Sequence, residues 1–316
     1  MTAAWVAGST RARALVRRRA GPSLARRVAG CGSVAEAVAV LADTSYGHDV
    51  RRDQGLSAAQ WAVLAALLWH LRVLAGWLPP EGGRMMRVLV RWFELANVDE
   101  LMYRFTGRPG EPEFVLGSMD TAWSRLRRCA SPAEIQTVLA DSPWGDPGGD
   151  GHREIQLGMR LAWGARLLDA VPSAKTWILG AVALLVARVR HAEGLDLPPR
   201  VRDRCLPLLG ADASGAPSIT EMAGRLPSAA RWALRDIADP RELWRGEERW
   251  WRRVEEEGLG LLAGSGFSSG PVLGAVAVLA SDAWRVRGAL ESAARGGDAG
   301  HPAWIRPPGR GGDDLA

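Results

Sequence analysis

The sequence predicts an all-α protein assembled from three similar helical units. One capped-helix segment occurs twice along the 316 residues, and a second, apolar helical segment recurs further on. The composition supports the same fold class, since alanine, leucine and arginine dominate and all three are good helix formers. Segments with the alternating pattern of β-strands are scarce.

The first repeat joins residues 31–47, CGSVAEAVAVLADTSYG, to residues 129–145, CASPAEIQTVLADSPWG. The two segments align without a gap at an offset of 98 residues, and nine of the seventeen positions are identical. A repeat of this length indicates duplication of one structural unit.

Each copy carries the signals of a helix start. Ser33 with Glu36, and Ser131 with Glu134, have the spacing of capping boxes. Pro132 stands at the first helical position, where its missing N–H costs nothing. The sequence therefore predicts two equivalent N-capped helices.

Each of these helices is expected to stop at an aromatic residue followed by glycine, Tyr46-Gly47 or Trp144-Gly145. A glycine suits a left-handed helix end, and the aromatic ring is expected to pack into the core of its own unit. The matched Cys31 and Cys129 precede the two helix starts, and packing of a small residue explains them better than thiol chemistry.

The long apolar stretch at residues 61–78 approaches membrane-spanning length, but His70 and Arg72 lie in its interior. A capping box at Ser57-Gln60 and a stop at Pro79-Pro80 favour a buried helix of a soluble protein over a transmembrane helix.

The second repeat pairs GAVALLVARVR, from Gly180, with GAVAVLASDAWRVR, from Gly274, at an offset of 94 residues. Residues 87–107 form a counterpart near the start of the chain, and residues 239–242, Asp-Pro-Arg-Glu, offer a third Pro-started cap. Loops are expected where Gly and Pro cluster, at 79–83, 107–112, 145–151 and 264–271. The predicted domains are 1–110, 111–210 and 211–295, followed by a disordered tail at 296–316.

The formal net charge is +5 and Lys175 is the only lysine. The arginines are interleaved with Asp and Glu along every helix, which disfavours a nucleic-acid partner. The one concentrated run is Arg11, Arg13, Arg17, Arg18 and Arg19. It fits either a solvated helix end or contact with an acidic partner or lipid head groups.

No catalytic, cofactor-binding or metal-binding residue is predicted, and no cofactor. The five histidines lack metal-ligand spacing, and no phosphate-binding glycine motif opens a helix. The glycine-rich residues 264–270 are expected to form a flexible loop, and the acidic run 255–257 a solvated helix face. Three cysteines without an apolar leader indicate a reducing compartment.

The order of three segments resembles the C subunit of bacterial and archaeal rotary V/A-type ATPases, a family whose eukaryotic members are called the d subunits. An N-terminal helix with TRARAL is followed by SVAEAVAVLADTSYG and then by RWFELANVDELMYRFTGRP. The resemblance is clearest over residues 1–110. The positions that carry it are Trp5, Arg11, Ala12, Arg13, Ala14, Leu15, Leu41, Thr44, Tyr46, Gly47, Phe93, Glu94, Leu95, Asn97, Val98, Leu101 and Gly107.

This resemblance implies three similar helical domains arranged as a funnel about a pseudo-threefold axis. It implies a non-catalytic central-stalk component that couples the D/F shaft to the membrane proteolipid ring, in ATP-driven proton or cation transport or in ATP synthesis. The implied location is the cytoplasm, peripheral on the cytoplasmic face of the cell membrane. The second and third copies of the Asn-containing helix depart from the family pattern, at residues 186–190 and 281–287.

Two other interpretations stay open on the sequence alone. A helical-repeat scaffold unrelated to an ATPase would bind another protein on a concave face. A helical enzyme with scattered catalytic residues would carry a deep polar pocket with perturbed titratable groups.

Overall fold

The computed structural model describes residues 3–107 and 110–297. Within them the chain forms helices, turns and irregular connections and no β-strand, so the all-α prediction is confirmed. The α-helices are α1 (Val6–Arg17), α2 (Gly21–Ala29), α3 (Val34–Ala42), α4 (Leu56–Ala75), α5 (Pro80–Leu89), α6 (Arg91–Phe105), α7 (Trp123–Leu126), α8 (Pro132–Ala140), α9 (His152–Ala170), α10 (Lys175–Ala187), α11 (Pro199–Leu209), α12 (Ile219–Arg225), α13 (Ser228–Arg231), α14 (Leu243–Ala263) and α15 (Ser269–Ala294). Short 3-10 helices lie at Ala3–Trp5, Ser45–His48, Gly117–Met119, Pro172–Ala174, Trp232–Leu234 and Pro240–Glu242, and a π-helix follows α10 at Arg188–Ala192.

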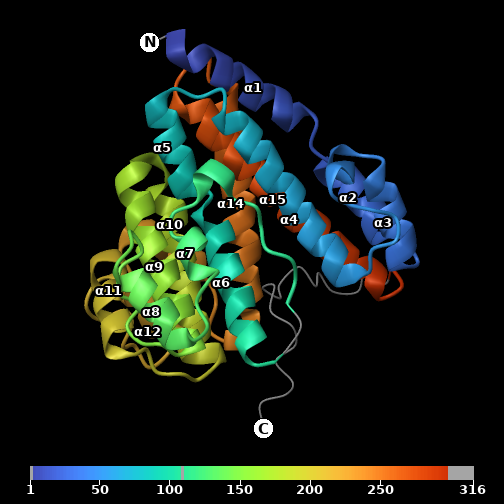
Figure 1. Ribbon diagram of the computed structural model, residues 1–316. Helices are drawn as coiled ribbons and strands as arrows, with labels where there is room; N and C mark the ends of the chain where they lie inside the picture. The colour runs from blue at the N-terminus through green and yellow to red at the C-terminus, as the bar shows by residue number, and fades with distance from the viewer. Residues whose placement is uncertain (1–2, 108–109, 298–316) are drawn as a thin grey trace.

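Helix α15 is the long central element of the fold. It packs against α14, α4, α2 and α1, so the end of the chain holds the beginning in place (Figure 1). Close approach of α14 and α15 depends on two glycines. A Cβ atom on Gly274 would lie 2.5 Å from the carbonyl oxygen of Gly258, so only glycine fits there.

The buried side chains form two hydrophobic clusters. The larger draws on α1–α10, α14 and α15, and the smaller runs from Leu157 of α9 to Leu243 at the start of α14. The smaller cluster contains the buried residues of α11, α12 and α13, which lie on the left of the molecule in Figure 1 together with α9 and α10. The domain boundaries at 110 and 210 stay predictions, and the tail predicted from residue 296 lies, from residue 298 on, outside the described residues.

Both predicted N-caps are present. The Ser33 hydroxyl accepts a hydrogen bond from the backbone N–H of Glu36, and Ser131 does the same for Glu134. Each of these glutamates reaches back to the backbone N–H of the residue before the serine, so both copies start their helices alike.

The third predicted cap, at residues 239–242, is present. The Asp239 side chain accepts from the backbone N–H of Arg241, and Pro240 opens a 3-10 turn, Pro240–Glu242, that runs directly into α14 at Leu243. The helix with the Ser-x-x-Glu arrangement is α12, where the Ser218 hydroxyl accepts from the backbone N–H of Glu221. This copy was missed because the residues after Ser218 diverge from the repeat.

The predicted helix ends at Tyr46-Gly47 and Trp144-Gly145 also need correction. Helices α3 and α8 end earlier, at Ala42 and Ala140, and the aromatic residues lie in the turns that follow. Gly145 has the left-handed conformation, with a φ of 72°, whereas Gly47 does not. Gly47 is required for space instead, because a Cβ atom there would lie 2.0 Å from the carbonyl oxygen of Ala42.

Two further boundaries differ from the sequence prediction. Residues 79–83 are not a loop, since Pro80 opens α5 as an N-terminal proline rather than stopping the preceding helix. Gly82 allows this turn to pack against the 3-10 helix Ala3–Trp5 that precedes α1, because a Cβ atom there would lie 2.8 Å from the Trp5 ring. The predicted cap at Ser57 is absent, because α4 begins at Leu56 after Gly55, and the Ser57 hydroxyl binds Glu111.

Among residues 3–107 and 110–297, two segments are long and apolar enough to span a membrane by length and composition, Leu56–Ala75 and Pro172–Ala192. Half of the first window and 61% of the second are buried inside the fold. That burial is what core helices of a folded domain show, and α4 lies along α15 on this buried side.

The N-terminal arginine run is divided between two roles. Arg13 donates to the carbonyl oxygens of Leu262, Gly264 and Gly266, so it ties α1 to the turn between α14 and α15. Arg17 and Arg18 are exposed at the end of α1. Of these three arginines, only Arg17 and Arg18 fit the solvated helix end that was one of the two interpretations of the run.

Candidate functional site

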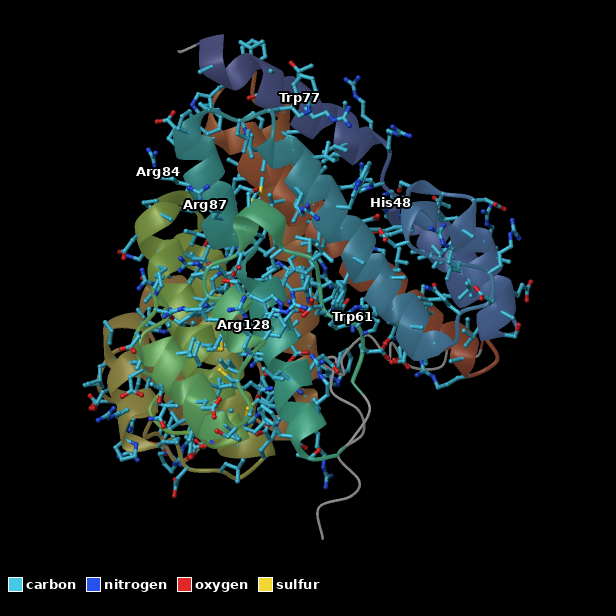
Figure 2. All side chains as sticks on the ribbon, in the orientation of Figure 1. His48, Trp61, Trp77, Arg84, Arg87 and Arg128 are labelled. Carbon is cyan, nitrogen blue, oxygen red and sulfur yellow. The ribbon has the colours of Figure 1, made fainter. Side chains whose placement is uncertain are left out.

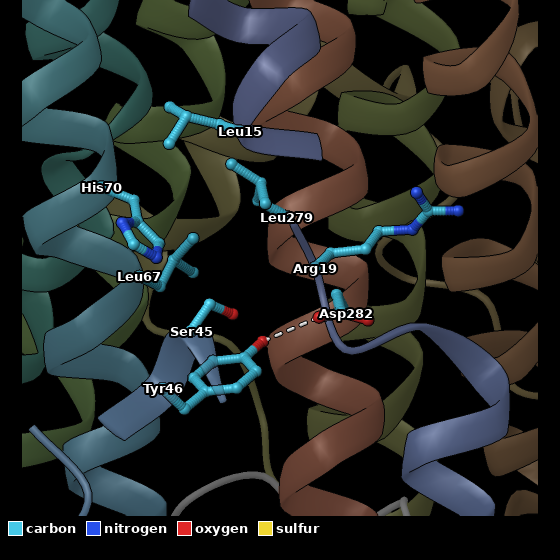
Figure 3. Close-up of a pocket in the computed structure, with 8 residues that line it drawn as sticks. All are labelled: Leu15, Arg19, Ser45, Tyr46, Leu67, His70, Leu279 and Asp282. Carbon is cyan, nitrogen blue, oxygen red and sulfur yellow. Dashed lines mark hydrogen bonds between the residues drawn. The ribbon is translucent and has the colours of Figure 1, made fainter. Parts of the chain in front are cut away.

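A buried carboxylate joins α15, the last helix among the described residues, to the first repeat. Asp282 of α15 is fully buried and accepts hydrogen bonds from the backbone N–H groups of Ala20, at 2.9 Å, and Gly21, at 2.7 Å. It also accepts a hydrogen bond from the Tyr46 hydroxyl at 3.0 Å (Figure 3). One side chain of α15 therefore fixes both α2 and the aromatic residue that follows α3.

Helix α2 depends on this carboxylate for its N-terminal cap. Its own N-cap residue, Ala20, has no side chain that could accept from the first backbone N–H groups, which a helix leaves unpaired. Burial raises the pKa of Asp282, although the three hydrogen bonds and Arg285 favour its charged form. Burial and the adjacent Asp282 raise the pKa of Tyr46 well above its ordinary value, so Tyr46 stays a donor.

A second buried carboxylate repeats this arrangement. Glu94 of α6 is 1% exposed and accepts from the backbone N–H groups of Thr121 and Ala122, both at 2.8 Å. The indole N–H of Trp144 donates to the same carboxylate at 2.8 Å. Thr121 and Ala122 directly precede α7, so Glu94 holds the start of α7, while the Asp120 side chain accepts from the first helical N–H groups, those of Trp123 and Ser124.

The two junctions have the same parts in the same order. In each junction, a carboxylate on a long helix accepts from backbone N–H groups at the start of a shorter helix, α2 or α7. The next helix, α3 or α8, is the one capped by serine. The same carboxylate also binds the aromatic residue that follows this serine-capped helix. Tyr46 and Trp144 are the aromatic positions of the sequence repeat, so the repeat in sequence is also a repeat of contacts. We call these two arrangements the Asp282 junction and the Glu94 junction.

The segment that the second sequence repeat aligns with α15, α10 with the π-helix after it, carries a positive charge at the position of Asp282. Aligning Gly180 with Gly274 places Arg188 where α15 has Asp282. Arg188 forms an ion pair with Glu247 of α14. Burial raises the pKa of Glu247, while the adjacent Arg188 favours its charged form. At this position the chain therefore uses a charge pair between helices instead of a carboxylate cap.

Asn97, one of the family-like positions, also has a structural role. Its side-chain amide donates to the carbonyl oxygen of Phe114 at 3.0 Å, and its carbonyl accepts from the Phe114 backbone N–H at 2.6 Å. Both residues are buried. Asn97 thereby holds the extended segment between α6 and α7 against the core.

A small cavity of about 10 Å³ lies beside the Asp282 junction, about the size of one water molecule. Leu15, Tyr46, His70 and Asp282 are among its walls (Figure 3). Burial lowers the pKa of His70, and its Nδ1 atom is buried without a hydrogen-bond partner. The cavity is too small for an organic substrate.

A wider groove of about 480 Å³ is open to solvent between the Trp232 turn and α14. Its walls are Trp232, Arg235, Arg249, Arg252, Arg253, Glu256 and Glu257. Arg253 pairs with Glu257 at 2.6 Å and Arg252 with Glu248 at 2.9 Å, so much of its charge is already neutralised.

The acidic run 255–257 is therefore not simply a solvated face, as the sequence predicted. Glu255 pairs with Arg285 of α15, and both side chains are 17% exposed. Glu257 accepts from the indole N–H of Trp177 as well as from Arg253. Two of the three glutamates thus connect α14 to its neighbours, and only Glu256 is exposed.

One further charged cluster lies between α6 and α9. Asp99 pairs with Arg160 at 3.0 Å, and the His152 Nε2 atom lies 3.8 Å from its other oxygen. Burial acts to raise the pKa of Asp99, but Arg160 and His152 outweigh it and hold that pKa below its ordinary value. The cluster links two packed helices.

The described part of the chain contains no group of three His, Cys, Asp or Glu side chains that could hold a metal ion. Cys31, Cys129 and Cys205 are free thiols. Cys31 and Cys129 donate to the carbonyl oxygens of Arg27 and Arg125, four residues earlier in each case, which fits the packing role predicted for them.

The exposed apolar side chains include two tryptophans, Trp69 at 37% and Trp77 at 52% exposed. Trp77 lies at the turn between α4 and α5, and Val6 near the start of α1 is 41% exposed. Arg84 and Arg87 extend from α5 on the same end of the molecule (Figure 2). Partly exposed tryptophan beside arginine is the composition that protein interfaces favour.

The sequence matches no protein-family model. No curated protein matches it significantly either. The geometry of the junctions therefore carries the functional argument.

Of the residues singled out in the sequence, Tyr46, Trp144 and Glu94 lie in the junctions. Asp282 lies within residues 281–287, which the sequence marks only as a departure from the family pattern, so its role is not predicted. The available signal was an acidic residue inside an otherwise apolar helix, which is costly to bury without partners.

Proposed function

We propose that this chain is a non-catalytic coupling component of the central stalk in a rotary V/A-type ATPase. Three similar helical units surround a pseudo-threefold axis and form a funnel. One side of the funnel sits on the proteolipid ring at the cytoplasmic face of the membrane, and the D/F shaft inserts into the other. The chain transmits rotation, while ATP chemistry and ion movement take place in other proteins of the complex.

One observation carries the proposal. In the Glu94 junction the carboxylate binds Trp144, 50 residues further on, and in the Asp282 junction the carboxylate binds Tyr46, 236 residues earlier, so α15 is tied back to the first repeat. A head-to-tail contact that returns from the last unit to the first is what closes a ring, whereas an open solenoid leaves its end units unconnected. A closed ring of helical units is a stiff body suited to carry torque.

The family-like positions support the proposal through their contacts. Tyr46, Glu94 and Asn97 each hold a neighbouring segment by hydrogen bonds from a buried side chain. Phe93 and Leu41 are fully buried in the larger cluster. Residues that build a rigid frame would resemble their family counterparts even where interface residues have changed.

The first test is recovery of partners. The full chain, carrying an affinity tag, is purified from membranes of its own cell after mild detergent extraction, and the bound proteins are identified by mass spectrometry. The proposal expects D- and F-type shaft proteins together with a proteolipid. An Asp282→Ala variant, which opens the ring, is expected to lose both partners, and recovery of neither partner by the unaltered chain would defeat the proposal.

A helical-repeat scaffold that binds another protein is the second candidate. It is favoured by Arg188, because the third copy lacks the carboxylate that the other two share. A scaffold of this kind would recover a soluble partner and would not sediment with a proteolipid ring, so the same experiment separates the two.

A further inference from the structure

Three segments from distant parts of the chain meet at one end of the molecule. They are the start of α1, the turn from α4 into α5, and the turn between α14 and α15. The indole N–H of Trp5 donates to Glu81 of α5 at 2.7 Å, and the Ser9 hydroxyl donates to the carbonyl oxygen of Ser268 at 3.3 Å. These bonds hold the three segments together, so the side chains that they expose belong to one surface.

Two apolar side chains are exposed at this end. Trp77 is 52% exposed and Val6 is 41% exposed. Trp77 lies directly against α1, since a Cβ atom on Gly8 would approach the Trp77 carbonyl oxygen to 3.1 Å. Unlike Trp5, Trp77 has no acceptor for its indole N–H among the described residues. An exposed indole with an unused N–H has the amphipathic character of the tryptophans found where a membrane meets water.

The same end carries positive charge with little negative charge to balance it. Arg84 and Arg87 are exposed one turn apart on α5, on the end of the molecule that Trp77 occupies, and neither has an ion pair within the described part of the chain (Figure 2). Residues 3–35, which include all of α1, contain seven arginines and no Asp or Glu. Glu81 is the one acidic residue of the segment 54–93, which contains four arginines. The surface is therefore positively charged around an exposed tryptophan.

This combination favours a lipid surface over a protein partner. Tryptophan beside arginine is also common at protein interfaces, but neither of the two cavities described above is lined by Trp77 or Val6. A second copy of the chain would bring like charges together. An anionic membrane needs no groove, accepts indole rings at the depth of its head groups and attracts basic side chains.

We propose that Val6, Trp77, Arg84 and Arg87 bind the surface of a membrane that contains anionic lipid. Trp77 and Val6 enter the interfacial layer, and the two arginines bind lipid phosphate groups. The partner is the lipid itself, so the proposal goes beyond the coupling function and does not rest on it.

Flotation of the full chain with protein-free vesicles tests this surface. The chain is expected to float with vesicles of phosphatidylcholine and phosphatidylglycerol, and much less with phosphatidylcholine alone. The double variant Arg84→Gln, Arg87→Gln is expected to weaken binding about tenfold or more, because each basic side chain near an anionic surface strengthens binding about fivefold. Trp77→Ala should weaken binding about threefold or more, and Trp77→Tyr should retain most of it, because binding scales with the apolar area that enters the interface.

The double variant Arg26→Gln, Arg27→Gln is the matched control. Both arginines are exposed on α2 and have no ion pair among the described residues, and α2 lies far from α5 (Figure 1). This variant is expected to leave vesicle binding unchanged, and circular dichroism checks that every variant keeps its helices. Failure of the unaltered chain to float with anionic vesicles would overturn the proposal, as would equal weakening by the control. Loss of a protein partner on Trp77→Ala without any vesicle binding would assign this end to a protein instead.

Discussion

The Tyr46 hydroxyl donates a 3.0 Å hydrogen bond to the Asp282 carboxylate across 236 residues of chain. Both side chains are buried, and the same carboxylate caps α2. This bond joins the end of the chain to its beginning, and it has a counterpart in the bond from Trp144 to Glu94.

The bond between Tyr46 and Asp282 should contribute measurably to stability. Tyr46→Phe removes only the hydroxyl and is expected to lower the free energy of unfolding by about 1.5–3 kcal/mol, as for other hydrogen bonds to charged groups. Tyr46→Ala also leaves a cavity and should cost ~3 kcal/mol or more. Urea denaturation followed by tryptophan fluorescence measures both.

A double-mutant cycle with Asp282→Asn distinguishes this bond from simple packing. If the hydroxyl acts through the carboxylate, Tyr46→Phe should cost much less in the Asp282→Asn background. Additive losses would mean that the two side chains do not interact.

Substitution of the cap serines tests whether the three short helices start alike. Ser33→Ala, Ser131→Ala and Ser218→Ala should each lower the free energy of unfolding by about 1 kcal/mol, the usual value of an N-cap side chain. Ser124→Ala, at an exposed serine whose hydroxyl has no bond among the described residues, serves as the control and should be neutral. If Ser218→Ala leaves the free energy of unfolding unchanged, α12 does not start in the same way as α3 and α8.

The substitution Gly47→Ala tests the close contact between Gly47, the residue after Tyr46, and the carbonyl oxygen of Ala42. Gly47→Ala places a Cβ atom 2.0 Å from the carbonyl oxygen of Ala42, so the turn must move. We expect a loss of ~2 kcal/mol or more in thermal or urea unfolding, as for other overpacked sites. Gly55→Ala meets nothing within 4 Å and should change stability little, and equal effects at the two sites would contradict the steric explanation.

The junction carboxylates predict a pH dependence of definite sign. Burial raises the pKa of Asp282 above its ordinary 3.8 and that of Glu94 above 4.5. A carboxyl group with a higher pKa in the folded state binds its proton more tightly there. Its contribution to stability is complete below the unfolded pKa and is lost as pH rises through the folded pKa.

The stability difference between the natural chain and an Asp282→Asn, Glu94→Gln variant should therefore shrink as pH is raised from about 4 to about 7. Asp99→Asn is the control of opposite sign. The pKa of Asp99 is lowered, so its contribution is present above 3.8 and is lost as pH falls below that value. A series of urea titrations from about pH 2 to about pH 7 measures both differences, and a difference that grows with pH for the junction variant would contradict the account.

The parts of the fold that the sequence predicted are those set by local signals. Ser33 and Ser131 stand at fixed spacing before a glutamate, and hydrogen bonds over three residues need no tertiary context. Pro80 shows the limit of such signals, since the same proline that can stop one helix can open the next.

The junctions could be predicted only in part. The repeat marked Tyr46 and Trp144 as equivalent, but not what they bind, because their partners lie 236 and 50 residues away. Asp282 and Arg188 occupy equivalent positions with opposite charge, so even a correct alignment of the repeats would have predicted the wrong partner for one of them.

The central claim, that this chain couples rotation to ion movement, is tested most directly by ATP-driven ion uptake in inverted membrane vesicles from cells that lack the chain. The account predicts that these vesicles still hydrolyse ATP but do not accumulate ions, and that adding the purified chain restores uptake. Ion uptake at the normal rate without the chain would contradict it.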